Sequence, residues 1–195
     1  KINNKNASNL EIAWIFEMKN YKGDIQANPI IVDGIIYTPV AGGYIVALDG
    51  KSGNLIWKSK KFGNSVARRG LLYHKNKNDK IARLIFSNRE KLVSLNAENG
   101  DFIKSFGRNG QVKRTGLNVT TPVIYKDNIV IVTWDRAIEV YDLYSGETKW
   151  KLKYINKISK RFGGKKFNNN GSNSWGGISL DKKRGILYFT TGNPH

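Results

Sequence analysis

A repeat of about 47 residues constrains the fold of this chain more than any other feature. Three segments each carry an Asp or Asn followed four residues later by a turn glycine, and these glycines are Gly53, Gly100 and Gly146. β-rich, alternating runs precede each turn, and no segment longer than about ten residues keeps an unbroken helical period. Four short strands repeated at this interval are typical of the blades of a β-propeller. The sequence therefore predicts an all-β fold.

The local signals inside the repeats agree with this prediction. Asp33-Gly34 lies between two β-rich runs and is a strong hairpin signal, while Trp57 and Trp150 follow the turns of the first and third repeats. A β-sandwich would use the same local signals, but the turn and the tryptophan recur in register, which favours a propeller. Residues 10–16 look like the last strand of a preceding unit. We expect one partial propeller domain over residues 1–195, with four-stranded antiparallel blades near residues 29–57, 83–104, 122–150 and 177–195.

Composition excludes several other classes of protein. The chain has 33 Lys and Arg against 15 Asp and Glu, a formal net charge of +18, but the basic residues are scattered along it. A nucleic-acid interface should concentrate them, so we expect no nucleic-acid partner. The absence of cysteine excludes disulfides and cysteine-based metal sites. No apolar run approaches the roughly 18 residues that a membrane span needs.

Particular motifs resemble a known family. Residues 49–57 and 142–150 resemble the tryptophan-docking repeat of propellers that bind pyrroloquinoline quinone (PQQ). Three further stretches narrow the resemblance to the quinoprotein alcohol and glucose dehydrogenases, and they are residues 26–34, 69–73 and 174–194. The last is the most specific, because a Trp-Gly and a Thr-Gly-Asn-Pro occur at a separation of 18 residues, from Trp175 to Asn193.

The resemblance implies a fold and an activity. The family forms an eight-bladed propeller with PQQ and Ca²⁺ near its axis, of which this chain would be a fragment of about three and a half to four blades. The full enzyme would oxidise an alcohol or an aldose sugar by hydride transfer to PQQ and pass the electrons to a quinone or cytochrome. The resemblance also implies a periplasmic location, with membrane association an open alternative. The family's catalytic base is an aspartate in a later blade, so we assign no catalytic residue here.

The resemblance also implies the residues of a cofactor site. A flat ring such as that of Trp175 can stack on a planar quinone, and Arg69 can bind a quinone oxygen or a carboxylate. The amide oxygen of Asn193 suits Ca²⁺, which prefers oxygen ligands. The cofactor-binding candidates are Gln26, Arg69, Thr120, Asn173 and Trp175, and the metal candidate is Asn193.

The chain departs from the family pattern at two places. Some relatives carry a vicinal disulfide, and others a histidine, just before the Arg-Gly, whereas this chain has Gly-Asn-Ser-Val-Ala-Arg at residues 63–68. Relatives also carry a glutamate calcium ligand in an extension that is short here, at residues 132–137, where Asp135 is a candidate replacement. The alternative function is a non-catalytic PQQ-repeat propeller that serves as a protein-interaction scaffold. Convergence of Gln26, Arg69, Trp175 and Asn193 on one central cavity would separate the two. We expect the fragment alone to be inactive and poorly folded, since an open propeller leaves blade faces uncovered.

Overall fold

The structure is a computed structural model that describes residues 2–19, 25–63, 66–114, 116, 120–154, 174 and 176–192. Apart from one short 3₁₀ helix, η1 (Ala7–Asn9), its regular elements are strands. The first sheet contains β1 (Ile30–Val32), β2 (Ile35–Val40), β3 (Tyr44–Asp49) and β4 (Leu55–Lys58). The second contains β5 (Leu72–His74), β6 (Arg83–Asn88), β7 (Lys91–Asn96) and β8 (Gln111–Lys113). The third contains β9 (Val123–Tyr125), β10 (Asn128–Val132), β11 (Ala137–Asp142) and β12 (Thr148–Lys153), and β13 (Ile178–Asp181) pairs with β14 (Ile186–Phe189).

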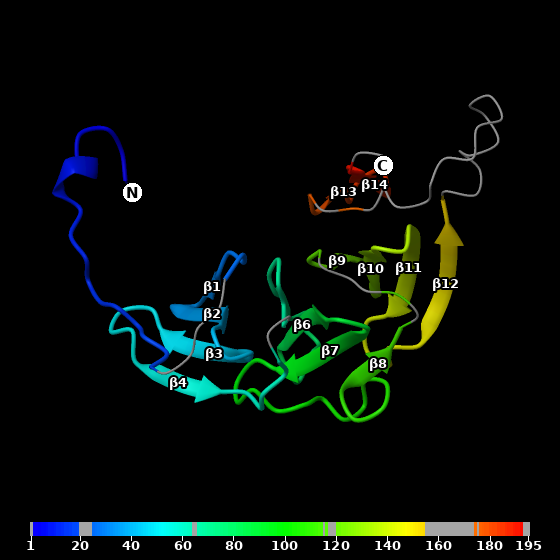
Figure 1. The fold of residues 1–195 in the computed structure, drawn as a ribbon, viewed down its shortest axis with the longest axis horizontal. Coiled ribbons are helices and arrows are strands. Elements are labelled where there is room, and N and C mark those ends of the chain that lie inside the picture. The colour runs from blue at the N-terminus through cyan, green and yellow to red at the C-terminus, as the bar shows by residue number, and fades with distance from the viewer. Residues whose placement is uncertain are drawn as a thin grey trace.

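The sheets follow one another along an arc. Within each sheet every strand pairs antiparallel with its neighbours in sequence, so the chain meanders from the first strand to the fourth. In Figure 1 the outer strands β4, β8 and β12 lie on the convex side of the arc, and β13 lies beside β9. The strands β1, β5, β9 and β13 therefore form the inner edge. We call the sheets β1–β4, β5–β8 and β9–β12 blades 1, 2 and 3, and the pair β13–β14 the start of blade 4. The predicted all-β architecture of four-stranded antiparallel blades is confirmed.

The repeated turn has a clear physical basis. The Asp49 carboxylate accepts hydrogen bonds from the backbone N–H and the hydroxyl of Ser52, both at 2.7 Å, and Gly53 takes a φ of 74°. The third blade repeats this geometry at Asp142 and Ser145. A left-handed backbone conformation costs about 1–2 kcal/mol for a residue that has a Cβ atom, and glycine avoids this cost. This explains the glycine at the fifth position of the turn.

These glycines also receive an aromatic ring. A Cβ added at Gly100 would lie 2.6 Å from the ring of Trp57, whose Nε1–H donates to the carbonyl of Ala97 at 3.0 Å. Trp57 therefore packs from blade 1 onto the turn of blade 2. Trp14 packs on Gly53 in the same manner, although residues 10–18 are not a strand in the structure.

The blades are joined by two apolar clusters, because the central strands bury both faces. In β6, Leu84 and Phe86 face blade 1, while Ile85 between them faces blade 3. Successive strand side chains point to opposite faces, so a strand between two blades reads as a continuous apolar run. The cluster between blades 2 and 3 also contains Phe106 and Ile131, both fully buried.

The second repeat extends beyond the expected residues 83–104. Its inner strand starts at Leu72, and its outer strand lies at Gln111–Lys113, whereas Phe102 forms only an isolated bridge with Leu95. A left-handed run at Gly107, Asn109 and Gly110 makes an extra turn before the outer strand. This turn brings Phe106 to Gly146 of blade 3, where a Cβ would lie 3.1 Å from its ring, so phenylalanine replaces the docking tryptophan.

Candidate cofactor site

The starts of the inner strands of three blades lie side by side. Asn28, just before β1, forms a parallel bridge with Gly70, just before β5. The hydroxyl of Thr121, just before β9, donates to the carbonyl oxygen of Arg69 at 2.8 Å. A Cβ at Gly70 would lie 2.9 Å from the Thr121 hydroxyl, so only glycine allows this approach without movement. The structure thus brings the segments that contain Gln26, Arg69 and Thr120 together at the start of the inner strands.

Arg69 sits in a tight turn. Gly70 N–H donates to the carbonyl of Ala67 at 2.9 Å, and Ala67 N–H donates to the carbonyl of Ser87 at 2.9 Å. Ala67 has a φ of 43°, a left-handed conformation that an alanine rarely adopts. Arg69 is half-buried, while the neighbouring Arg68 is exposed. The turn therefore distinguishes two adjacent arginines that the sequence alone could not rank by burial.

Thr120 already uses its hydroxyl hydrogen within the protein. It is 2% exposed, and its hydroxyl donates to the carbonyl of Val132 at 3.2 Å. A hydroxyl has a single hydrogen, so a role as donor to a cofactor carboxylate would require this bond to be given up. Its role at the cofactor stays a prediction, as does that of Gln26, which is half-buried.

The other predicted residues, Asn173, Trp175 and Asn193, lie outside the described residues. Their described neighbours can be located. Ser174 is buried, and Gly176 lines a cavity of about 670 Å³ together with Thr121 and Thr190. This cavity lies between blade 3 and the start of blade 4, at the same end of the inner strands as Arg69.

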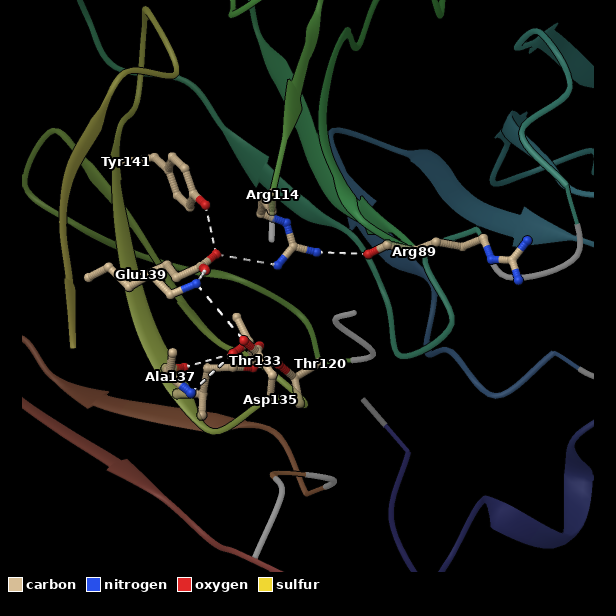
Figure 2. Close-up of polar contacts among 10 residues, drawn as sticks. Arg89, Arg114, Thr120, Thr133, Asp135, Ala137, Glu139 and Tyr141 are labelled. Carbon is tan, nitrogen blue, oxygen red and sulfur yellow. Dashed lines mark hydrogen bonds and ion pairs between the residues drawn. The ribbon is translucent and has the colours of Figure 1, made fainter. Parts of the chain in front are cut away.

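A buried charged cluster lies beside this end, and the sequence analysis missed it. Arg114 and Glu139 have side chains that are 0% and 2% exposed, and Arg114 Nη1 lies 3.7 Å from Glu139 Oε2. The Tyr141 hydroxyl donates to the same oxygen at 2.7 Å, and the Lys151 ammonium lies 2.6 Å from Oε1. Figure 2 shows Arg114 extending from Glu139 on one side to the backbone of Arg89 on the other, a hydrogen bond of 2.9 Å. Arg114 therefore ties blade 2 to blade 3.

Burial and neighbouring charges shift the pKa values of the residues in this cluster. Burial lowers the pKa of Arg114, and the Glu139 carboxylate opposes this effect. Burial raises the pKa of Tyr141, and the carboxylate of Glu139 raises it further. A sequence signal was available for Glu139, because it stands between Ala137 and Tyr141 on the buried face of a strand. Nothing in the sequence identified Arg114 as its partner.

The described residues do not by themselves form a metal site. They contain no cluster of three or more His, Asp or Glu side chains that could hold a metal ion. Asp135, the candidate replacement for the family's glutamate, lies 3.9 Å from the Lys151 ammonium and packs against Gly116. A cation beside a carboxylate weakens its attraction for a metal ion, so we derive no step through calcium from these residues.

The described residues fit an anionic, planar ligand better. Thr121 packs against Gly70, and Arg69, which directly precedes Gly70, is half-buried at this end of the inner strands. A guanidinium binds carboxylate and quinone oxygens through its planar array of donors. PQQ carries three carboxylates and a quinone, so this donor set matches its chemistry.

Successive antiparallel blades, each with its first strand at the inner edge of the arc, define this chain as part of a β-propeller. A family model described as "Glucose/ethanol/alcohol dehydrogenase, beta-propeller domain" (PQQ) matches residues 1–195, and the chain belongs to that family. The resemblance inferred from the motifs is thus confirmed. The glycerol dehydrogenase large subunit of Gluconobacter thailandicus is 27% identical over 241 aligned residues, which cover 99% of this chain and 32% of that protein.

Two further proteins are similar to this chain, one in sequence and one in fold. The outer membrane protein assembly factor BamB of Moranella endobia is 33% identical over 110 residues, covering 55% of this chain and 24% of that protein. The quinohemoprotein alcohol dehydrogenase structure from Comamonas testosteroni shares the fold with a TM-score of 0.67 and 20% identity, over 89% of this chain and 30% of that one. This chain therefore spans about a quarter to a third of the length of these relatives.

Within the described part of the chain, no helical segment has the length and apolar character that crossing a membrane requires.

Proposed function

We propose that this chain supplies blades of a quinoprotein dehydrogenase that oxidises an alcohol or an aldose sugar. The observation that carries the proposal is the contact of Gly70 with Asn28 and of the Arg69 carbonyl with Thr121, which joins the starts of three inner strands beside a cavity of about 670 Å³ that Thr121 lines. The membership of the family supports the same assignment. The proposal includes PQQ as cofactor, Ca²⁺ beside it and a periplasmic location.

Each candidate residue has a defined role in this proposal. Arg69 binds a quinone oxygen or a carboxylate of PQQ through its planar array of donors. Gln26, Thr120 and Asn173 offer polar groups to the carboxylates, and Trp175 stacks on the ring plane. Asn193 offers an amide oxygen to the metal.

The chemistry divides between this chain and the bound group. When bound, PQQ supplies the quinone that accepts a hydride from the CH–OH carbon of the substrate. The hydroxyl proton goes to the family's aspartate base, which the resemblance places beyond His195. This chain would bind and orient PQQ, with Arg69 donating hydrogen bonds to a quinone oxygen or to a carboxylate.

The test is PQQ binding by the purified full-length protein, followed by reduction of an artificial dye in the presence of a sugar or alcohol, because the fragment alone is expected to be inactive. We expect Arg69→Gln to weaken PQQ binding by at least about tenfold, because a charge-assisted hydrogen bond is lost. Arg68→Gln is the matched control, since Arg68 is the exposed neighbour and should leave binding unchanged. Absence of PQQ binding by the unaltered protein, or equal effects of the two substitutions, would contradict the proposal.

The second candidate is a non-catalytic propeller scaffold, favoured by the identity with BamB over 55% of the chain. It requires no PQQ binding, and it leaves Arg69 as an ordinary half-buried cation. A protein that folds, ignores PQQ and reduces no dye with any sugar or alcohol would support this candidate over the dehydrogenase.

A further inference from the structure

A second cavity lies at the opposite end of the inner strands. Strand β9 runs from Val123 to Tyr125; Thr121 before it lines the first cavity, and Lys126 after it lines the second. The second cavity has a volume of about 730 Å³, within the range of about 300–1,000 Å³ common for small-molecule sites. The inner strands β5, β9 and β13 all contribute to it.

Positive charge converges on this cavity from three blades. Lys75 follows β5, Lys126 follows β9 and Lys182 follows β13, and all three line the cavity. Asp127 is the acidic residue in the lining. The lysines exceed the acid by two charges, and a concave, partly apolar surface focuses such a field on an anion.

A histidine–aspartate pair adds a titratable group to the lining. His74 Nε2 lies 3.3 Å from Asp79 Oδ2, with side chains 13% and 10% exposed, and Asp79 is held by the backbone N–H of Asn76 at 2.9 Å. Burial lowers the pKa of His74; the Asp79 and Asp127 carboxylates oppose this, and the Arg83 and Lys182 cations add to it. His74 is therefore mostly neutral at neutral pH and can gain a proton when an anion arrives.

The walls of the cavity are apolar and aromatic. Leu72, Val123 and Leu180 contribute aliphatic surface from three inner strands. The Tyr125 hydroxyl lies against Gly185, where a Cβ would be 2.9 Å away, so the ring is held between blade 3 and blade 4. The Lys126 ammonium lies 5.4 Å from the centroid of this ring. A ligand that suits this surface has an apolar body and ionised groups at its edge.

We propose that this second cavity binds a small organic dianion, such as an aromatic dicarboxylate. Its carboxylates pair with Lys126 and Lys182, and its body packs against Val123 and Leu180. A dianion matches the two excess charges of the lining, and the apolar walls distinguish it from an inorganic anion. Val123 lines both cavities, but Lys126 and Lys182 line the second one alone, so the inference does not depend on the proposed cofactor site.

The test is isothermal titration calorimetry of the purified full-length protein with phthalate, inorganic phosphate and benzyl alcohol. We expect phthalate to bind at least tenfold more tightly than either of the others. Lys126→Gln and Lys182→Gln should each weaken phthalate binding several-fold, because each removes a charge-assisted hydrogen bond. Lys183→Gln is the matched control, since Lys183 is the exposed neighbour of Lys182 and lies outside the lining.

The pH dependence supplies a second readout. A bound dianion favours protonated His74, whose pKa is lowered by burial, so affinity should rise as the pH falls below about 6.5. Benzene-1,3-disulfonate is the ligand for this measurement, because its own charge does not change there. His74→Asn should flatten the profile.

Four results would overturn the proposal. They are no phthalate binding, equal affinity for phosphate or benzyl alcohol, indifference to both lysine substitutions, and loss of phthalate binding in Arg69→Gln. The last result would locate the dianion at the candidate cofactor site instead. Because phthalate and PQQ binding are measured separately, failure of this inference is distinguishable from failure of the proposed function.

Discussion

Arg114 and Glu139 form an ion pair that is almost wholly removed from solvent, between blades 2 and 3. Removing one partner of such a pair leaves an uncompensated buried charge, which costs about 3–5 kcal/mol. We therefore expect Glu139→Gln to lower the free energy of unfolding by an amount in that range, measured by urea titration. The double substitution Arg114→Met with Glu139→Leu should cost less than the single one, because no buried charge remains.

The exposed pair of Arg184 with Asp181, at 2.8 Å, provides the control. The Arg184 side chain is 71% exposed, so Arg184→Met should cost less than about 1 kcal/mol. Equal losses for Glu139→Gln and Arg184→Met would show that the buried cluster contributes no more than a surface pair.

At this scale the sequence predicted some residues and not others. Arg69 was identified from its motif, and the structure locates it where three blades meet. Arg114 carries no local signal, since its significance comes from Glu139, which is 25 residues away in the chain and lies on another blade. Contacts between blades depend on packing that a single sequence does not display.

The packing of an aromatic ring against a turn glycine of the next blade is a recurring contact between neighbouring blades. Gly100 and Gly34 have nearly equal φ values, 77° and 79°, but a Cβ at Gly100 meets the Trp57 ring and one at Gly34 meets nothing within 4 Å. Gly34→Ala should cost about 1–2 kcal/mol through its backbone alone. Gly100→Ala should cost roughly 1–3 kcal/mol more through overpacking. Thermal unfolding of the two variants measures the difference, and equal losses would argue against docking.

The turn aspartates make the blades sensitive to acid. Hydrogen bonds from the Ser52 hydroxyl and backbone lower the pKa of Asp49, and the backbone and guanidinium of Arg184 lower that of Asp181. Burial pushes the pKa of Asp142 up, but hydrogen bonds from Ser145 and its neighbours outweigh this and lower it. A folded-state pKa below the unfolded one gives stability that is present above the unfolded value, near about 4, and is lost as the pH falls through the folded value.

We therefore expect the melting temperature to fall steeply below about pH 4. Replacing Asp49, Asp142 and Asp181 together by Asn should lower stability at pH 7 and flatten the acid branch of the profile. An unchanged acid branch in the triple variant would show that other carboxylates control acid unfolding.

The turns were also the best predicted elements, because their chemistry is local. An aspartate, a serine or asparagine and a glycine at fixed spacing are sufficient to define them. The outer strand of blade 2 was not predicted, since Phe106 replaces the tryptophan and an extra turn at residues 107–110 delays the strand. Where the local pattern is interrupted, the next strand is set by contact with blade 3.

The net charge of +18 belongs to the whole molecule rather than to one site. Scattered Lys and Arg should bind duplex DNA weakly and without sequence preference, through phosphates alone. We expect affinity for a short duplex to fall at least tenfold between roughly 50 and 200 mM salt, and to be equal for unrelated sequences. Fluorescence anisotropy measures both, and a clear sequence preference at high salt would contradict the prediction that nucleic acid is no partner.

The general architecture followed from the repeat, whereas the position of the site did not. A period of about 47 residues with a docking tryptophan predicted blades before any contact was known. The contacts of Gly70 with Asn28 and of Arg69 with Thr121 could not be inferred, because the partners are far apart in the chain and each contact is made by backbone or by one hydroxyl.

The hydrogen bond from Thr121 to the Arg69 carbonyl would couple ligand binding at the proposed site to the stability of the contact between blades 2 and 3. In the proposed function, a ligand bound by Arg69 contacts the residue that also joins blade 2 to blade 3, so binding that strengthens this hydrogen bond would stabilise the contact. Thermodynamic reciprocity then requires that loosening the joint, even by a substitution far from any ligand atom, release the ligand by the same factor. A propeller of this kind can therefore lose a cofactor through a substitution that weakens the contact between two blades, although every residue that contacts the cofactor is unchanged.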